Sequence, residues 1–288
     1  RIGDYVTIQR AGDVIPQIVS VDVTKRKINL ERYIFPIKCP SCGSQTIKEI
    51  NTNTKKIDAI RRCVDKEYKC QHIAKEKLKH FVSKDAFNID GLGKKVIDQF
   101  WELKLIQTPS DIFNLNYTIV TNLEGWGKLS CENLKNSIKK SSYIPLDKFI
   151  YSLGIRHIGE ENAKLLGNFF ISINKFIELL NTSKRKNLLK NIDELDGIGV
   201  AQLKSLEAFF SSKSNSKIIS SLIKHLKIEN SKILNKNGKL SGKAIMFTGG
   251  FEKISRSEAK SLVEENGGKV LSSISKKLLK IEIETKNT

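Results

Sequence analysis

A short glycine motif recurs four times along the chain and constrains its fold more than any other feature. The second glycine of the motif falls at positions 93, 127, 159 and 199, so the copies are 34, 32 and 40 residues apart. In the third copy, His157 replaces the first glycine. An apolar segment with helical spacing precedes each copy, and a recurring period of about 20–50 residues is typical of a repeated supersecondary unit. We therefore expect four units, each with a helix, a tight hairpin and a second helix.

The chemistry of this hairpin favours phosphate binding. Glycines lack a Cβ atom, so both can adopt positive φ and let an anion approach the backbone closely. The N–H groups at the start of the following helix then point toward the anion, and the helix dipole adds to the attraction. The alternative is that the glycines only form turns between helices. One copy alone would favour that alternative, whereas four copies favour contacts with a phosphate backbone.

Two nucleotide-binding motifs can be tested against the same glycines, and neither fits. A dinucleotide fingerprint requires a third glycine three residues after the second, where Val96, Ser130 and Gln202 stand instead. The nearest approach to a P-loop, from Gly238 to Lys243, is one residue too short. The phosphates are therefore expected to belong to a nucleic-acid backbone. The predicted contacts are Gly91, Gly93, Lys94, Lys95, Gly125, Gly127, Lys128, Arg156, His157, Gly159, Gly197 and Gly199.

The charge balance is consistent with this partner. The chain carries 50 Lys and Arg against 31 Asp and Glu, a net charge of +19. Such an excess favours polyanions, with nucleic acid ahead of an anionic membrane surface. Alternatively, part of the excess reflects AT-biased codons, because Lys, Asn, Ile and Ser are all abundant. The sequence contains no apolar run long enough to predict a membrane span.

Four of the five cysteines are close in sequence and predict a metal site. Cys39 and Cys42 form a Cys-x-x-Cys turn, and Cys63 and Cys70 follow. Four thiolates complete the tetrahedral coordination of a structural zinc ion and leave no open position for catalysis. The second pair has unusually long spacing, so His72 is a substitute ligand ranked below Cys70. The alternative is four reduced cysteines without a metal.

The remaining segments predict a mixed architecture. Residues 1–36 alternate polar and apolar positions in short bursts, including Lys27–Leu30, which is typical of the last strands of a small β-barrel or sheet. Helical spacing dominates from about residue 72 to 225. Strands at 243–248 and 269–271, with an amphipathic helix between them at 255–266, predict an α/β unit.

The order of these parts resembles the C-terminal half of bacterial NAD-dependent DNA ligases, to about residue 277. The matching stretches are RAGDVIPQIV at 10–19, CPSCG at 39–43, HFVSKDAFNIDGLG at 80–93, GIRHIGEENA at 154–163, and LSGKAIMFTGGF with SRSEAKSLVEENGGKV within 240–270. The resemblance implies a multidomain, mainly α-helical fold with a β-rich OB-fold remnant and a truncated α/β BRCT unit. Its parts are the C-terminal end of an OB-fold (1–36), a four-cysteine zinc finger (37–71), four helix-hairpin-helix motifs (72–228), a linker (229–238) and an incomplete BRCT domain (239–288).

The resemblance also implies a function. Members of this family join a 3′-hydroxyl to a 5′-phosphate at a nick in duplex DNA, during replication and repair. They use NAD and Mg²⁺ to adenylate a lysine in a Lys-x-Asp-Gly motif. Here the Asp-Gly pairs at Asp90 and Asp196 follow Asn88-Ile89 and Glu194-Leu195, and neither has the lysine. The resemblance therefore predicts no catalytic residue in this chain, structural Zn²⁺ at the cysteines, and NAD and Mg²⁺ in domains outside it.

Three functions are open at this point. The chain is a DNA-clamping portion of a ligase that is inactive alone, a stand-alone DNA-binding module, or a decayed product without activity. Because it begins at Arg1 and its BRCT segment is short, a fragment or a disrupted reading frame is expected. The resemblance predicts a monomer in the bacterial cytoplasm that binds nicked double-stranded DNA and no membrane.

Overall fold

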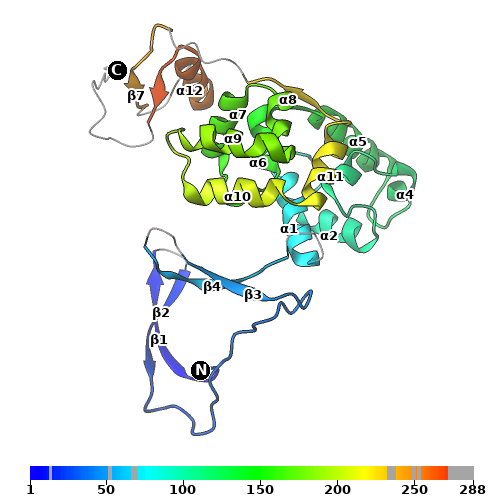
Figure 1. The fold of residues 1–288 in the computed structure, drawn as a ribbon. Helices are drawn as coiled ribbons and strands as arrows, with labels where there is room; N and C mark the ends of the chain where they lie inside the picture. Colours follow the sequence, from blue (N-terminus) through cyan, green and yellow to red (C-terminus); the bar gives the residue numbers. More distant parts are fainter. Residues whose placement is uncertain are drawn as a thin grey trace, which may run out of the picture. The chain divides into compact units, whose positions relative to one another are not determined.

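The computed structural model describes residues 1–12, 15–50, 54–65, 70–231, 238–247, 251 and 254–271. Its contacts divide the chain into two units, Arg1–Asp65 and Lys66–Thr288, and Figure 1 shows their elements. The first unit is built from strands and the second mainly from helices. The predicted multidomain, mainly α-helical fold is confirmed.

The first unit consists of two antiparallel hairpins. Strand β1 (Tyr5–Ala11) pairs with β2 (Ile15–Asp22), and β3 (Thr46–Ile50) pairs with β4 (Ile57–Cys63). The prediction of a strand at Lys27–Leu30 is wrong. This segment is a turn, in which the Leu30 N–H donates to the Lys27 carbonyl. Its polar and apolar residues alternate, but no neighbouring strand pairs with it among the described residues.

Apolar side chains of the first unit remain exposed. None of the fully buried hydrophobic residues in the described part of the chain lies before Cys70. A two-stranded hairpin has too few neighbours to bury both of its faces, so side chains such as Ile8 and Ile18 face outward. The strands predicted from the alternating pattern are present, while the described residues form no closed barrel.

The second unit contains the four predicted helical hairpins, numbered here in chain order. Each has a helix, a turn that carries the glycine motif, and a second helix. They are α1 (Gln71–Phe81) with α2 (Lys94–Glu102), α4 (Tyr117–Thr121) with α5 (Lys128–Ser141), α6 (Leu146–Ser152) with α7 (Glu160–Phe170), and α9 (Thr182–Asp193) with α10 (Val200–Phe210).

Short elements connect and flank these hairpins. Strand β5 (Tyr143–Pro145) pairs in parallel with β6 (Lys227–Glu229), so the chain after the fourth hairpin returns to the start of the third. The other connecting elements are α3 (Pro109–Ile112), α8 (Ile173–Phe176), the 3₁₀ helix η1 (Ile177–Leu180) and α11 (Lys213–Leu222).

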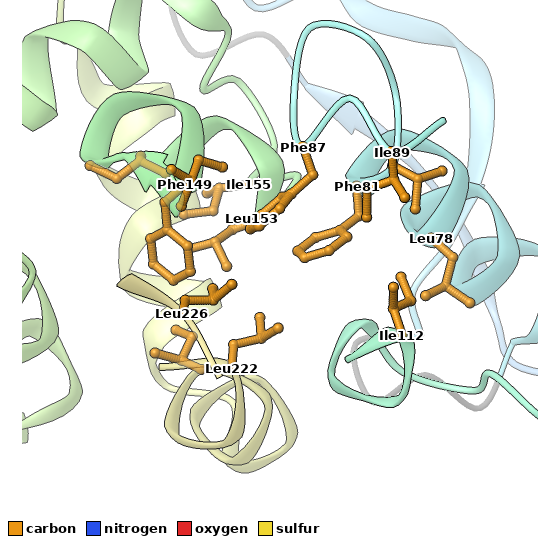
Figure 2. Close-up of a cluster of buried hydrophobic side chains, with 14 of the residues drawn as sticks. Leu78, Phe81, Phe87, Ile89, Ile112, Phe149, Leu153, Ile155, Leu222 and Leu226 are labelled. Atoms are coloured by element: carbon orange, nitrogen blue, oxygen red, sulfur yellow. The ribbon is translucent and has the colours of Figure 1, made fainter. Parts of the chain in front are cut away.

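One hydrophobic core joins the helices of the second unit from α1 to α11. Phe81 stacks on Phe87 with ring centroids 4.2 Å apart. Phe176 packs edge-on against Phe149 and Phe210, which come from the third and fourth hairpins. Figure 2 shows the side chains of hairpin 1 facing those of hairpin 3, with Leu222 from α11 beside them. The hairpin turns are therefore held on a shared, rigid scaffold.

The C-terminal segment forms the predicted strand, helix and strand. Strand β7 (Ala244–Ile245) pairs in parallel with β8 (Lys269–Val270), and α12 (Arg256–Glu265) connects them. Ser255 begins the helix with a capping box, in which its hydroxyl accepts from the Glu258 N–H and the Glu258 carboxylate accepts from the Ser255 N–H. Residues 272–288 of the predicted BRCT segment lie outside the described residues.

Candidate nucleic-acid interface and metal site

The four hairpin turns share one backbone conformation. The first position of the motif has a positive φ in every copy: 90° at Gly91, 81° at Gly125, 62° at His157 and 98° at Gly197. The prediction of a left-handed first position is confirmed. His157 adopts the same conformation as the glycines, and histidine is among the few residues that tolerate it. The third hairpin is therefore a true copy of the other three.

The apolar residue between the two motif positions anchors each turn. Leu92, Ile158 and Ile198 are buried in the core, and half-buried Trp126 packs on Phe100 with ring centroids 5.3 Å apart. In every copy the N–H of this residue donates to the carbonyl three residues earlier, at distances of 3.0–3.3 Å. The turn is thus fixed by its own hydrogen bond and by burial of one side chain.

The second glycines have a different conformation from the one that the sequence suggested. Their φ values are −66°, −119°, −84° and −125° at positions 93, 127, 159 and 199, which is extended backbone open to any residue. The expectation of positive φ at both glycines is therefore wrong for the second one. These glycines are instead the N-caps of α2, α5, α7 and α10.

Nothing within the described protein requires glycine at these caps. A methyl group at Gly93, Gly127 or Gly159 would meet no described atom within 4 Å. At Gly199 it would meet only the Gln202 side chain, at 3.5 Å. Helix capping alone would be served better by Ser, Asp or Asn. The missing side chain instead leaves the first turn of each helix accessible from outside.

The side chains around these caps differ between hairpins. Lys94 and Lys95 begin α2 and Lys128 begins α5, and all three are exposed. By contrast, α7 begins with Glu160 and Glu161, which sequence reasoning overlooked because it treated the four copies as equivalent. The signal was present in the two residues that directly follow the second glycine.

Other predicted contacts also lie at the turns. Arg156 and His157 are exposed in the third turn, where the Asn162 side-chain amide donates to the His157 carbonyl. Asp90 and Asp196 lie in the turns of hairpins 1 and 4 and are exposed. The two Asp-Gly pairs thus belong to hairpins.

The hairpins pack in pairs. A methyl group at Gly91 would lie 3.3 Å from Leu134 of α5, and one at Gly197 would lie 3.1 Å from Leu165 of α7. The Trp126 indole also donates to the Gln99 side chain of α2. Hairpins 1 and 2 therefore form the first pair, and hairpins 3 and 4 form the second pair.

The four predicted cysteine ligands come together in space. The sulfur atoms of Cys39, Cys42, Cys63 and Cys70 all lie within 4.8 Å of one another. Tetrahedral zinc, with Zn–S bonds of about 2.3 Å, requires sulfur atoms about 3.8 Å apart, so the spacing fits such an ion. Exposed His72 is not in the group, which is the one candidate metal cluster among the described residues. The four cysteines could therefore hold a metal ion.

The cysteine turn supports this arrangement. The Cys39 N–H donates to the Ser44 carbonyl at 2.7 Å, and Gly43 adopts φ of 73° to close the turn. Hydrogen bonds with Ser44 lower the pKa of the Cys42 thiol to about 7. Burial raises the pKa of the Cys63 thiol to about 12. Because thiolates are the metal-binding form, a cation here must displace the Cys63 proton.

No helix within the described ranges is both long and apolar enough to cross a membrane. Four tandem helix-hairpin-helix units, a cysteine cluster and a β-α-β unit define a multidomain, mainly helical protein. Models of known families match two of these parts. The helix-hairpin-helix motif matches residues 148–219, which contain all of hairpin 4 and hairpin 3 except its first two residues, and the BRCA1 C Terminus (BRCT) domain matches residues 235–281.

Similarity to whole proteins points to one enzyme family. The chain is 53% identical over 278 residues to a DNA ligase of Pelagibacter ubique (strain HTCC1062), a match that covers 96% of this chain and 40% of that protein. It is 42% identical over 285 residues to a DNA ligase of Rickettsia bellii (strain RML369-C), with the same coverage. The chain thus spans about 40% of the length of the curated relatives it matches. It corresponds to the C-terminal part of a DNA ligase, as the sequence resemblance indicated.

Proposed function

We propose that this chain holds nicked duplex DNA for an NAD-dependent DNA ligase. The observation that carries the proposal is the repeated N-cap glycine, which neither backbone conformation nor packing explains at positions 93, 127 and 159. A DNA phosphate that approaches the helix N-terminus closely does explain it. Similarity to ligases across almost the whole chain supports the same partner.

Binding through these turns is independent of DNA sequence. Backbone N–H groups and lysines contact phosphate oxygens, which position a protein on the duplex without reading its bases. A nick-sealing enzyme requires this property, because nicks arise in any sequence. We propose that the twelve turn residues predicted from the sequence form this contact surface. We also propose the predicted domain boundaries, which place these residues in the helix-hairpin-helix domain at 72–228, between the zinc finger and the BRCT segment.

The metal site has a structural role in this proposal. Four thiolates fill the coordination sphere of Zn²⁺ and leave no position for substrate. The spacing of the Cys39, Cys42, Cys63 and Cys70 sulfur atoms supports zinc as the ion. Zinc then stabilises the segment that contains the Cys-x-x-Cys turn.

The chemical step belongs to other domains. NAD and Mg²⁺ serve an adenylated lysine that stands two positions before an Asp-Gly pair. The two Asp-Gly pairs of this chain lie in hairpin turns, and Asn88 and Glu194 occupy the position of that lysine. We propose that this chain binds DNA as a monomer and does not seal nicks by itself.

Nick sealing tests this assignment directly. The chain is assayed with NAD and a nicked duplex, alone and together with the N-terminal portion of a related ligase. Sealing is expected only in the combined reaction. Sealing by this chain alone contradicts the proposal, and tight DNA binding without rescue of sealing favours a stand-alone DNA-binding module.

A further inference from the structure

The four hairpins share a backbone but differ in charge. Each turn can be compared over the eight residues that end two positions after its second glycine: 88–95, 122–129, 154–161 and 194–201. With His157 counted as neutral, these segments carry net charges of +1, 0, −1 and −2 in chain order. Electrostatic attraction for a phosphate therefore decreases steadily from the first hairpin to the fourth.

Local charge, and not the net charge of +19, decides what each turn binds. Exposed charges interact over a screening length of only about 8 Å at physiological salt. A phosphate at one helix N-terminus therefore responds mainly to the residues of that turn. Because the turns have the same backbone, their side chains determine the difference between them.

The first pair has the features of a strong phosphate site. Lys94, Lys95 and Lys128 stand in the first turns of α2 and α5, which contain no acidic residue. Their cations add to the positive end of each helix dipole. Contact of Gly91 with Leu134 holds the two hairpins of this pair together.

The second pair has opposing features. Glu160 and Glu161 occupy the first turn of α7, where a carboxylate takes the place favoured for a phosphate. Lys148 pairs with Glu160 at 2.6 Å and Lys260 with Glu161 at 3.1 Å. Both lysines are half-buried but both carboxylates are exposed to solvent, so the compensation is weak. In hairpin 4, Glu194 and Asp196 precede the second glycine without a cation in the turn.

A backbone donor of hairpin 4 is also occupied. The Gly199 N–H donates to the Gln202 side chain at 3.2 Å, and α10 then begins with two apolar residues. In hairpin 2 the Gly127 N–H likewise donates to the Ser130 hydroxyl, at 2.9 Å, whereas no side chain caps the N-terminus of α2 in hairpin 1 among the described residues. The occupied donor is therefore shared by hairpins 2 and 4, and the difference between the two pairs rests on their charges.

We infer that the hairpins differ in their contribution to DNA binding: hairpins 1 and 2 bind the phosphate backbone, and hairpins 3 and 4 contribute little to this contact. The inference rests on the proposed function and assigns that function to one half of the array. The second pair supports the first through the shared core, in which Phe81 and Phe149 are both fully buried.

One matched set of variants tests this difference between the hairpins. Alanine replaces the second glycine of each hairpin in turn: Gly93→Ala, Gly127→Ala, Gly159→Ala and Gly199→Ala. The added methyl group is tolerated by the fold but blocks close approach of a phosphate. Loss of one charge-assisted hydrogen bond weakens binding about tenfold. We expect this loss at positions 93 and 127, and less than a twofold loss at 159 and 199.

The possible outcomes distinguish the inferred difference between the hairpins from the proposed DNA-binding function on which it rests. Equal losses of affinity at all four positions contradict the difference between the hairpins and leave the proposed DNA binding by the turns intact. Unchanged affinity in all four variants contradicts the proposed DNA binding by the turns. Circular dichroism of each variant confirms that it is folded.

A second experiment tests the same inference by a gain of affinity, after removal of acidic charge from hairpin 3. The double variant Glu160→Gln/Glu161→Gln removes two carboxylates from the third turn and is expected to raise affinity for a nicked duplex severalfold. The matched control, Glu207→Gln/Glu229→Gln, removes two exposed carboxylates that lie on α10 beyond its first turn and on β6, away from the hairpin turns. An equal rise in both variants indicates a general charge effect and contradicts the inference. Binding is measured by fluorescence anisotropy on a labelled nicked duplex.

Discussion

Gly91 lies directly against Leu134, so that a methyl group at Gly91 would stand 3.3 Å from the leucine Cδ1 atom. Two residues later, Gly93 faces open space. The two glycines of one motif therefore have separate roles. Gly91 is required by the left-handed backbone and by the packing of hairpin 1 on hairpin 2, whereas Gly93 keeps the helix N-terminus accessible.

This difference predicts unequal effects of the same substitution on stability. Gly91→Ala forces a side chain into φ of 90° and is expected to lower the free energy of unfolding by about 1–2 kcal/mol. Gly93→Ala is expected to change it by less than about 1 kcal/mol, because lost capping and reduced chain entropy nearly cancel. Urea denaturation of both variants provides the measurement. Equal destabilisation would show that the second glycine is also structural.

The cysteine cluster predicts one tightly bound zinc ion per chain. Metal analysis of the purified protein is expected to find it, and Cys39→Ser is expected to lose it. Cys131→Ser is the matched control, because Cys131 is a buried cysteine outside the cluster. Loss of zinc from the control variant, or retention in Cys39→Ser, would contradict the assignment of ligands.

The same site predicts a direction of pH dependence. Without a metal, burial holds the pKa of Cys63 at about 12, so this thiol is protonated at neutral pH. Zinc binding must release that proton, and affinity is therefore expected to rise with pH and to fall in acid. Competition with a chromophoric chelator between pH 6 and 8 measures the trend. An affinity independent of pH would mean that Cys63 is not a ligand.

The hairpins could be predicted from the sequence because glycine spacing encodes a local conformation. Gly91, Gly125 and Gly197 all adopt the positive φ that their residue type suggests. His157 was also placed correctly, since its alignment with the glycines outweighed its residue type. Periodic apolar residues then identified the flanking helices, whose formation depends mainly on local patterns.

Other features depended on tertiary structure and could not be predicted. The extended conformation of Gly93 follows from its role as an N-cap, which a Gly-x-Gly pattern alone does not reveal. Lys27–Leu30 has the alternation of a strand but forms a turn, because strand formation also requires a partner. The choice of Cys70 over His72 was uncertain from spacing and became clear only when the cysteine sulfur atoms came together.

An ion pair in the first unit predicts sensitivity to acid. The Arg26 guanidinium donates two hydrogen bonds of 2.7 Å to Asp4, whose side chain is 2% exposed, and holds the pKa of that carboxyl below its usual range. A lowered folded-state pKa contributes stability that is present above the unfolded value of about 3.9 and is lost as pH falls below it. Hydrogen exchange in β1 is therefore expected to accelerate in acid relative to the intrinsic rate. Asp4→Asn should abolish this pH-dependent part, and an unchanged profile would contradict the role of the pair.

Salt dependence gives a quantitative test of phosphate binding. If each of the four hairpins neutralises one or two phosphates, the slope of log K against log salt is about −4 to −7. If only hairpins 1 and 2 hold the phosphate backbone, the same arithmetic gives a shallower slope of about −2 to −4. Lys94→Gln/Lys95→Gln should weaken binding to all duplex sequences equally and reduce the slope by about 2, because each lysine releases about one counterion. A matched change at Lys213 and Lys217, which lie on α11 beyond the hairpins, should leave the slope nearly unchanged. A filter-binding titration on nicked duplex measures all three proteins, and a flat salt dependence of the unmodified chain would remove the case for phosphate binding.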